Sequence, residues 1–150
     1  MTLMELKPVS KHNYMTVVDL KVHQHQEDYV APNGMSLLEA CYESDKYPFA
    51  VYYKGDIVGF IMCSYYPADD AYPISSWWLE RFMIDKDKQG QGLGKQALAL
   101  FLKDYRPDET VDEVRLGVEP ENAKAIRLYE SFGFVKEGVV EGEHVYVRKW

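Results

Sequence analysis

A glycine-rich segment near the middle of the chain has the composition of an anion-binding loop. It reads Gln89-Gly-Gln-Gly-Leu-Gly-Lys95 and stands between a stretch typical of a strand and one typical of a helix. Three glycines let the backbone approach a ligand closely, and the N–H groups and dipole of a helix N-terminus favour an anion. Because Lys95 adds a positive charge, the segment predicts a phosphate-binding loop. The alternative is a loop whose glycines only permit a tight turn.

Two common phosphate-binding motifs do not fit this loop. The dinucleotide motif G-x-G-x-x-G, counted from Gly90, needs a third glycine at position 95, which is Lys. A P-loop that ends in Gly94-Lys95 needs glycine at position 89 and Ser or Thr at position 96, and both positions hold Gln. The loop therefore matches neither motif.

A second candidate segment lies further along the chain and reads Asn122-Ala-Lys-Ala-Ile-Arg-Leu-Tyr129. We expect a helix over residues 121–132 that ends at Gly133 in a left-handed cap, with Phe134 packed behind it. About two helical turns separate Asn122 from Tyr129, so both side chains lie on one face of the helix. A tyrosine on an amphipathic helix can also be an ordinary core residue, and that alternative stays open at this point.

Together the two segments resemble the signatures of the GNAT N-acetyltransferases. Gln-x-x-Gly-x-Gly is similar to the pyrophosphate loop of that superfamily, which binds acetyl-CoA, and the Asn, Leu-Tyr and Gly-Phe positions are similar to its second signature. The separation of the two is the usual one, and the resemblance extends over nearly the whole chain. It implies an α/β (α+β) fold of the acyl-CoA N-acyltransferase type. We therefore expect a central mixed, mostly antiparallel sheet flanked by helices, with residues 1–150 in a single GNAT domain.

The resemblance also implies which residues bind acetyl-CoA. Main-chain groups of the strand before the glycine loop would bond the pantetheine arm, and one N–H would polarise the thioester oxygen. Asn122 would bridge the pantetheine amides, and Tyr129 would protonate the departing sulfur. The residues expected to bind the cosubstrate are Phe82, Met83, Ile84, Gln89, Gly90, Gln91, Gly92, Leu93, Gly94, Lys95, Asn122 and Ala125.

More narrowly, residues 78–85 and the glycine loop resemble the bacterial spermine/spermidine acetyltransferases. In those enzymes a carboxylate stands nine positions before the glycine signature, and here that position holds Glu80. Acetyl transfer needs a base, because an amine protonated at pH 7 must lose its proton before it attacks. The period of two places Glu80 on one strand face with Phe82 and Ile84. We expect Glu80 to accept the proton directly or through a water; the alternative is a surface or ion-paired glutamate.

The leading hypothesis is therefore an acetyl-CoA-dependent N-acetyltransferase whose acceptor is a primary amine, specifically a polyamine such as spermine or spermidine. Acidic residues would draw a polycation to the acceptor side, although each alone can be a solvated surface charge. They are Glu27, Asp28, Glu39, Glu43, Asp69, Asp70 and Glu80. Other acceptors stay open: an amino acid, an aminoglycoside or a protein N-terminus. A non-catalytic acyl-CoA sensor is a further alternative, against which Glu80 and Tyr129 argue.

Strands and helices alternate in a way that can position these residues. Alternation and β-rich runs predict strands, and a 3.6-residue period predicts helices. Strands are expected over 2–7, 49–54, 57–63, 76–84, 114–118, 134–140 and 144–149. Helices are expected over 11–26, 36–44, from the glycine loop to about 105, and 121–132, with a turn at 31–34. Ser36-Leu-Leu-Glu39 has the pattern of a capping box at a helix start.

Charge and composition exclude several classes of protein. The 150 residues carry a net charge of −7, so we expect no nucleic acid and no anionic membrane as partner. Cys41 and Cys63 have neither CxxC nor Cys/His spacing, which predicts no metal site and fits the reducing cytoplasm. No signal peptide or membrane-spanning run is visible. Because the last strands, over 134–149, can pair or exchange across a two-fold axis, a homodimer is expected.

Overall fold

The computed structural model describes residues 3–71, 73–107 and 109–150. Its strands are β1 (Met4–Pro8), β2 (Lys46–Tyr53), β3 (Asp56–Tyr66), β4 (Ser76–Ile84), β5 (Glu113–Val118), β6 (Val135–Val140) and β7 (Glu143–Lys149). Its helices are α1 (Tyr14–Asp19), α2 (Asn33–Tyr42), α3 (Leu93–Asp104) and α4 (Ala123–Ser131), with short 3-10 turns η1 (Gln24–Gln26) and η2 (Lys86–Lys88). Within the described ranges, no helix is long and apolar enough to cross a membrane.

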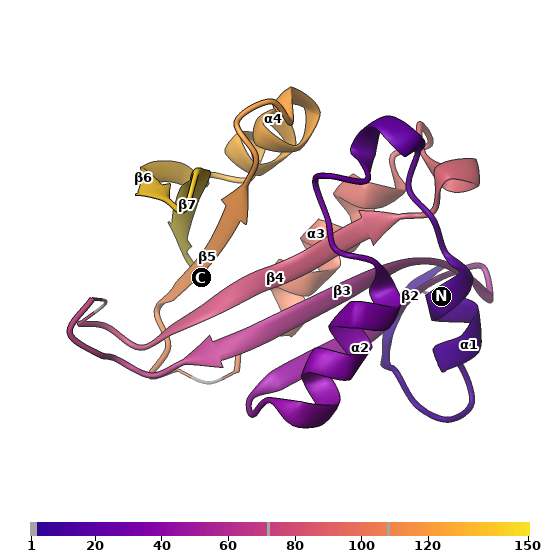
Figure 1. Ribbon diagram of the computed structural model, residues 1–150, viewed down its shortest axis with the longest axis horizontal. Coiled ribbons are helices and arrows are strands. Elements are labelled where there is room, and N and C mark those ends of the chain that lie inside the picture. The colour runs from indigo at the N-terminus through magenta and orange to yellow at the C-terminus, as the bar shows by residue number, and fades with distance from the viewer. Residues whose placement is uncertain (1–2, 72, 108) are drawn as a thin grey trace.

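The strands form one mixed sheet in the order β1-β2-β3-β4-β5-β7-β6 (Figure 1). Neighbouring strands are antiparallel except β4 and β5, which are parallel. The parallel pair is short, because β4 meets β5 only at Trp77 and Trp78, opposite Val114 and Arg115. Beyond these residues the two strands run apart (Figure 1). The expected α/β fold with a mostly antiparallel sheet is confirmed, and its strand arrangement opens a gap inside the sheet.

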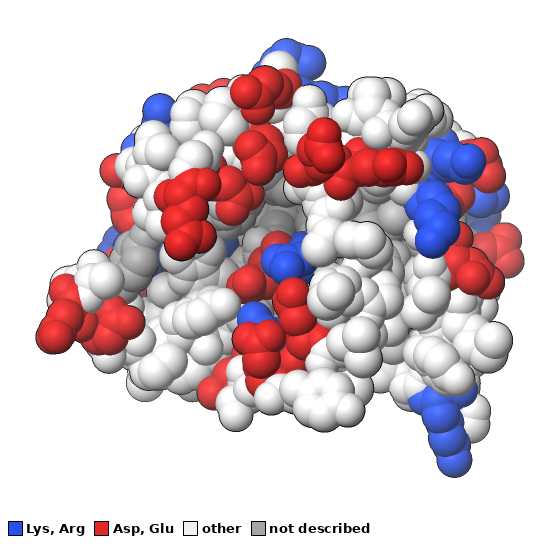
Figure 2. All heavy atoms as spheres, in the orientation of Figure 1, with Lys and Arg blue, Asp and Glu red and all other residues white. Residues whose placement is uncertain are grey.

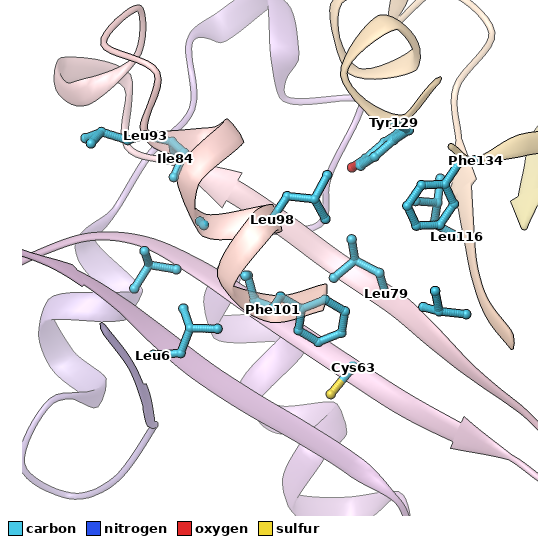
Figure 3. Close-up of a cluster of buried hydrophobic side chains, with 14 of the residues drawn as sticks. Leu6, Cys63, Leu79, Ile84, Leu93, Leu98, Phe101, Leu116, Tyr129 and Phe134 are labelled. Carbon is cyan, nitrogen blue, oxygen red and sulfur yellow. The ribbon is translucent and has the colours of Figure 1, made fainter. Parts of the chain in front are cut away.

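Helices cover both faces of the sheet, with a hydrophobic core under each layer. On one face Leu98 and Phe101 of α3 pack with Leu79 and Leu116 of the sheet (Figure 3). On the other face Val17 of α1 is fully buried in a second cluster with residues of β2, β3 and β4. The helix that begins at the glycine loop and the helices near the N-terminus therefore lie on opposite faces.

Two hairpins end in turns of the same kind. In the turn between β2 and β3, Lys54 and Gly55 have φ of 52° and 85°, and between β6 and β7 Glu141 and Gly142 have φ of 51° and 84°. Two consecutive left-handed residues are typical of the two-residue turn that fits the twist of antiparallel strands. Both hairpins agree with the sequence prediction, apart from strand ends that differ by a few residues.

The prediction of one helix over 11–26 is wrong. Helix α1 ends at Asp19, and the chain stays extended until η1. Two tertiary hydrogen bonds explain the break: the Lys21 N–H donates to Asp85 Oδ1 at 2.9 Å, and the Lys86 N–H donates to the Lys21 carbonyl at 2.7 Å. These bonds tie the N-terminal region to the loop after β4, and the local helical period carries no sign of them.

The predicted turn at 31–34 is also wrong, because α2 begins directly after Pro32. The helix therefore includes the residues that were expected to precede it. Ser36 is fully buried inside α2, and the Glu39 carboxylate accepts a hydrogen bond from Arg81 at 3.3 Å, so these two residues do not form a capping box. The Glu39 side chain binds Arg81 of β4 in place of a backbone N–H at the start of its own helix.

Replacing Gly59 of β3 by Ala is expected to lower the free energy of unfolding by about 2 kcal/mol. A Cβ at this position would stand 2.6 Å from the Met83 carbonyl oxygen of β4, and the backbone there cannot move without disturbing the strand pair. The thermal midpoint should fall by about 6 °C, measured by circular dichroism. The matched control is Gly138→Ala in β6, where an added Cβ meets nothing within 4 Å. Equal midpoints for the two variants would contradict the close approach.

Candidate active site

A cleft of about 1070 Å³ opens where β4 and β5 diverge. It is lined by the end of β4, the glycine loop with the start of α3, the end of β5 and the start of α4. The segment around η1, the end of β3 with the loop that follows it, and the turn between β6 and β7 also line the cleft. The two segments that the sequence singled out, on α3 and on α4, therefore face one cavity.

The glycine loop presents open backbone to this cleft. Gly90 and Gly92 have φ of 80° and 77°, which side chains rarely adopt, and a Cβ at either would meet nothing within 4 Å. Gly92 is the N-cap of α3, so the N–H groups of Leu93, Gly94 and Lys95 have no acceptor within the helix. All five residues line the cleft. Free N–H groups at a helix N-terminus beside a lysine fit a pyrophosphate.

The two glutamines of the loop differ in their contacts. The Gln89 amide donates to the Ile84 carbonyl at 2.9 Å and to the Gln26 side chain at 3.0 Å, and it accepts from the Gln26 amide at 3.1 Å. Its side chain therefore fastens the loop to the end of β4 and to η1. Gln91 is exposed and is absent from the residues of the described chain that line the cleft. The geometry therefore does not support the prediction that the Gln91 side chain contacts the cosubstrate.

The end of β4 leaves main-chain groups open toward the gap. Phe82, Met83 and Ile84 pair with β3 on one side and line the cleft on the other. A pleated strand turns its N–H and C=O groups alternately to its two neighbours, so those facing β5 have no strand partner here. Amide groups of an extended ligand can take the place of the missing strand. This is the arrangement that was expected for a pantetheine arm.

Helix α4 brings Asn122, Ala125 and Tyr129 to the opposite wall. Asn122 is the N-cap of α4, and its Oδ1 accepts from the Ala125 N–H at 3.3 Å, which leaves the side-chain NH₂ to donate elsewhere. The Tyr129 ring is buried and packs edge-on against Phe134, with ring centroids 5.8 Å apart. In Figure 3 its hydroxyl points away from Phe134. Burial raises the pKa of Tyr129, so its hydroxyl stays a proton donor at neutral pH.

The expectation that Glu80 shares a strand face with Phe82 and Ile84 is wrong. The pairing of β3 with β4 shifts at this point, because Met62 lies opposite Arg81 and the next residue, Cys63, lies opposite Leu79. Glu80 is thus the extra residue of a β-bulge, which interrupts the period of two. Phe82 and Ile84 pack on the α3 side, whereas Glu80 and Arg81 reach side chains on the α2 side.

Glu80 lines the cleft within a network of charged and phenolic groups. Its carboxylate accepts from the Tyr66 hydroxyl at 3.1 Å and lies 3.6 Å from both Lys46 Nζ and Arg81. Arg81 is in turn bonded to Glu39 of α2. The pKa of the Lys46 ammonium is raised because the attraction of Glu80 and the Tyr66 contacts exceed the opposing effect of burial. Glu80 lines the cleft, as a proton acceptor for the substrate would, and it is also ion-paired, as the alternative interpretation held.

Carboxylates outnumber cations in the lining of the cleft. Figure 2 shows Asp and Glu side chains gathered around a hollow on this face. Of the acidic residues that the sequence placed on the acceptor side, Glu39, Glu43 and Asp70 are outside the lining. Three others were missed, although each stands next to the end of a strand, which is the only sequence signal for them. The acidic lining residues are Glu27, Asp28, Asp69, Glu80, Glu119, Glu141 and Glu143, and the basic ones are Arg81, Lys88, Lys95 and Lys124.

Neither a metal centre nor a disulfide is found in the part of the chain that the structure describes. No group of three or more His, Cys, Asp or Glu side chains in that part could hold a metal ion. Both cysteines are free thiols, Cys41 exposed and Cys63 buried. Burial raises the pKa of the Cys63 thiol to about 12, so it stays protonated and unreactive.

The cleft and the strands that form it define an acetyltransferase fold, and comparison with known proteins agrees. The family model described as "Acetyltransferase (GNAT) family" matches residues 14–134. The chain belongs to the GNAT acetyltransferase family, as the two sequence signatures implied.

Two curated relatives match along nearly the whole chain. A probable spermine N(1)-acetyltransferase of Bacillus subtilis subsp. natto (strain BEST195) is 35% identical over 96% of this chain and 97% of its own length. The spermine/spermidine N(1)-acetyltransferase of Bacillus subtilis (strain 168) is 34% identical with the same coverage. The chain is therefore similar in length and sequence to enzymes named for polyamine acetylation.

Solved structures share the fold at lower sequence identity. The spermidine N-acetyltransferase from Vibrio cholerae, in complex with CoA and spermine, has a TM-score of 0.71 at 17% identity and covers 98% of this chain and 95% of its own. An aminoglycoside acetyltransferase in complex with coenzyme A reaches 0.77 at 17% identity, covering 97% and 94%. At such identities the likeness establishes the fold and carries nothing about the acceptor.

Proposed function

We propose that the protein transfers the acetyl group of acetyl-CoA to a primary amine of a polyamine such as spermine or spermidine. The observation that carries this proposal is the division of one cleft into two chemically different parts. Lys88 and Lys95 stand at the two ends of the glycine loop that leads into α3, whereas the other charged lining residues are seven carboxylates and two cations, Arg81 and Lys124. Anionic pyrophosphate fits the first part and a polycation fits the second. The names of the Bacillus relatives support this choice of acceptor.

The chain has residues suited to each part of acetyl-CoA. The loop from Gly90 to Lys95 would hold the pyrophosphate on its N–H groups, and the open edge of β4 at residues 82–84 would bond the pantetheine amides. The free NH₂ of Asn122 would bind the same arm from α4, beside Ala125. When bound, the cosubstrate supplies an activated acetyl thioester. An N–H of β4 would then stabilise negative charge on its carbonyl oxygen.

Two side chains would move the protons of the transfer. Glu80 would take the proton of the acceptor ammonium, directly or through a water, so that the free amine attacks the thioester carbon. As the new N–C bond forms and the C–S bond breaks, the Tyr129 hydroxyl would give its proton to the departing sulfur. The second proton that the nitrogen loses on becoming an amide would return to Tyr129 through solvent and restore the hydroxyl. The raised pKa of Tyr129 keeps that proton in place until it is needed. Both groups line the cleft. The presence of both favours catalysis over a non-catalytic acyl-CoA sensor.

The Michaelis constant for spermine is expected to rise several-fold between about 0.02 and about 0.3 M salt. Salt screens the attraction between an exposed acidic border and a polycation, because the Debye length falls from about 20 Å to about 6 Å over this range. The matched control is a monoamine assayed under the same conditions, whose single charge predicts a much smaller rise. Steady-state thiol release measures both constants. A Michaelis constant for spermine that does not change with salt concentration would contradict the electrostatic part of the proposal.

We further propose one catalytic domain that assembles as a homodimer in the cytoplasm. Both ends of the described chain join one sheet, which supports a single domain, and the free thiols fit a reducing compartment.

Strand β6 is a sheet edge whose Val135 and Val139 are 65% and 59% exposed, and such an edge can pair with a second copy. Sedimentation equilibrium should give twice the 17.4 kDa chain mass. Val139→Lys should yield monomers; a wild-type monomer would exclude the dimer.

A further inference from the structure

Glu143, the first residue of β7, reaches into the cleft from a strand that the sequence signatures do not include. Its carboxylate lies over Gly117 of β5, where an added Cβ would stand 3.3 Å from Glu143 Oε1. The backbone of Gly117 has an ordinary φ, so its conformation does not require glycine. The absence of a side chain at this position instead leaves room for the Glu143 carboxylate. Both residues line the cleft.

The strand register places Glu143 on the acceptor side of the sheet. Gly117 pairs with Val145, and Glu143 stands two residues before Val145, so the three side-chain positions share one face. Arg115, two residues before Gly117, pairs with Trp78 of β4 and continues the same face. The helix α3 packs on the opposite face. Glu143 therefore lies across the sheet from the helix whose start would hold the pyrophosphate.

Glu143 differs from Glu80 in having no side-chain partner among the residues that the structure describes. No hydrogen bond or ion pair reaches the Glu143 side chain from residues 3–71, 73–107 or 109–150, whereas Glu80 is held by Tyr66, Lys46 and Arg81. The carboxylate is half-buried, and its pKa is raised by burial and by the neighbouring carboxylates of Glu119, Glu80 and Glu141, against the opposing effect of Arg81. A half-buried, unpaired carboxylate among like charges gains most from an added cation.

We propose that Glu143 binds a second ammonium group of the acceptor, the one that does not react, and so selects polyamines over monoamines. This inference rests on the proposed function, because it assigns the reacting ammonium to Glu80 and the distant one to Glu143. A ligand with two cationic ends would bridge β4 and β7 across the gap. A monoamine would use only one of the two carboxylates.

The test compares a diamine with a monoamine of equal chain length, 1,4-diaminobutane and butylamine, in the wild-type protein and in Glu143→Gln. The substitution keeps the shape of the side chain and removes its charge. The Michaelis constant for the diamine should rise about ten-fold with little change in kcat, while both constants for the monoamine stay the same. Glu143→Asp should recover part of the loss. Glu109→Gln, an exposed carboxylate outside the cleft lining, controls for net charge.

Each outcome separates this inference from the function on which it rests. If the wild-type protein acetylates the monoamine as well as the diamine, the polyamine function and the role of Glu143 both fail. If the wild type prefers the diamine and Glu143→Gln keeps that preference, only the role of Glu143 is overturned. If Glu143→Gln raises the Michaelis constants of both acceptors equally, the residue does not select for the second charge. Coenzyme A affinity, measured by calorimetry, should be unchanged in the variant and verifies that its cleft is intact.

Discussion

Replacing Gly92 by Asp is expected to raise the dissociation constant for coenzyme A roughly 100-fold, or about 2.7 kcal/mol. Gly92 is the N-cap of α3 with a φ of 77°, so the new side chain adds backbone strain and sets a carboxylate before the N–H groups of the helix. That carboxylate would occupy the position of the pyrophosphate and would repel its negative charge. Isothermal titration calorimetry with coenzyme A measures the loss.

Two further variants separate charge at the loop from strain in the backbone. Gly55→Asp makes the same change at a φ of 85°, in the turn between β2 and β3, where an added Cβ also meets nothing within 4 Å. Its affinity for coenzyme A should equal that of the wild type. Gly92→Ala carries the strain without the charge and should lose much less than Gly92→Asp. Unchanged affinity in a folded Gly92→Asp protein would remove the loop from the cosubstrate site.

Replacing Tyr129 by Phe is expected to lower kcat at least about ten-fold, and toward the hundred-fold loss that is common when a general acid is removed. The change deletes one hydroxyl and leaves the ring, which is buried against Phe134. The thermal midpoint and the affinity for coenzyme A should therefore stay close to those of the wild type. Steady-state thiol release gives kcat, and calorimetry gives the affinity.

A second buried tyrosine provides the control for this substitution. Tyr146 belongs to the same hydrophobic cluster as Tyr129 but is not among the described residues that line the cleft. Tyr146→Phe should keep the wild-type kcat. Because burial raises the pKa of Tyr129 above its usual value near 10, the hydroxyl remains protonated between about pH 6 and about pH 9 and should add no limb to the pH profile there. Wild-type turnover in Tyr129→Phe would exclude the residue from the chemistry.

The wall of the cleft that would hold the cosubstrate was predictable from the sequence because its features are local. A glycine run before a helix creates open N–H groups wherever it occurs, and the Asn122–Tyr129 spacing sets one face of α4. The parallel pair of β4 and β5 then brings the two helices to one gap. Helix α3 was likewise predictable from its helical period, and the extent of strand β4 from its run of β-prone residues.

The acceptor wall was less predictable because it depends on contacts between distant segments. The bulge at Glu80 arises from the pairing of β3 with β4, and an alternating pattern does not reveal an extra residue. The bond from Lys21 to Asp85 ends α1 early and turns the following chain toward the cleft. Glu143 lies in the cleft beside Gly117, a residue of another strand that has no side chain, and the sequence pattern of β7 does not reveal this neighbour.

The acceptor is identified by thiol release from acetyl-CoA with a panel of amines at matched concentrations. The panel holds spermine, spermidine, an aminoglycoside, a free amino acid and a peptide with a free N-terminus. We predict the highest kcat/KM for spermine or spermidine, by at least ten-fold over the amino acid and the peptide. A higher kcat/KM for any acceptor outside the two polyamines would contradict the polyamine assignment, and coenzyme A binding without thiol release from any amine would contradict catalysis itself.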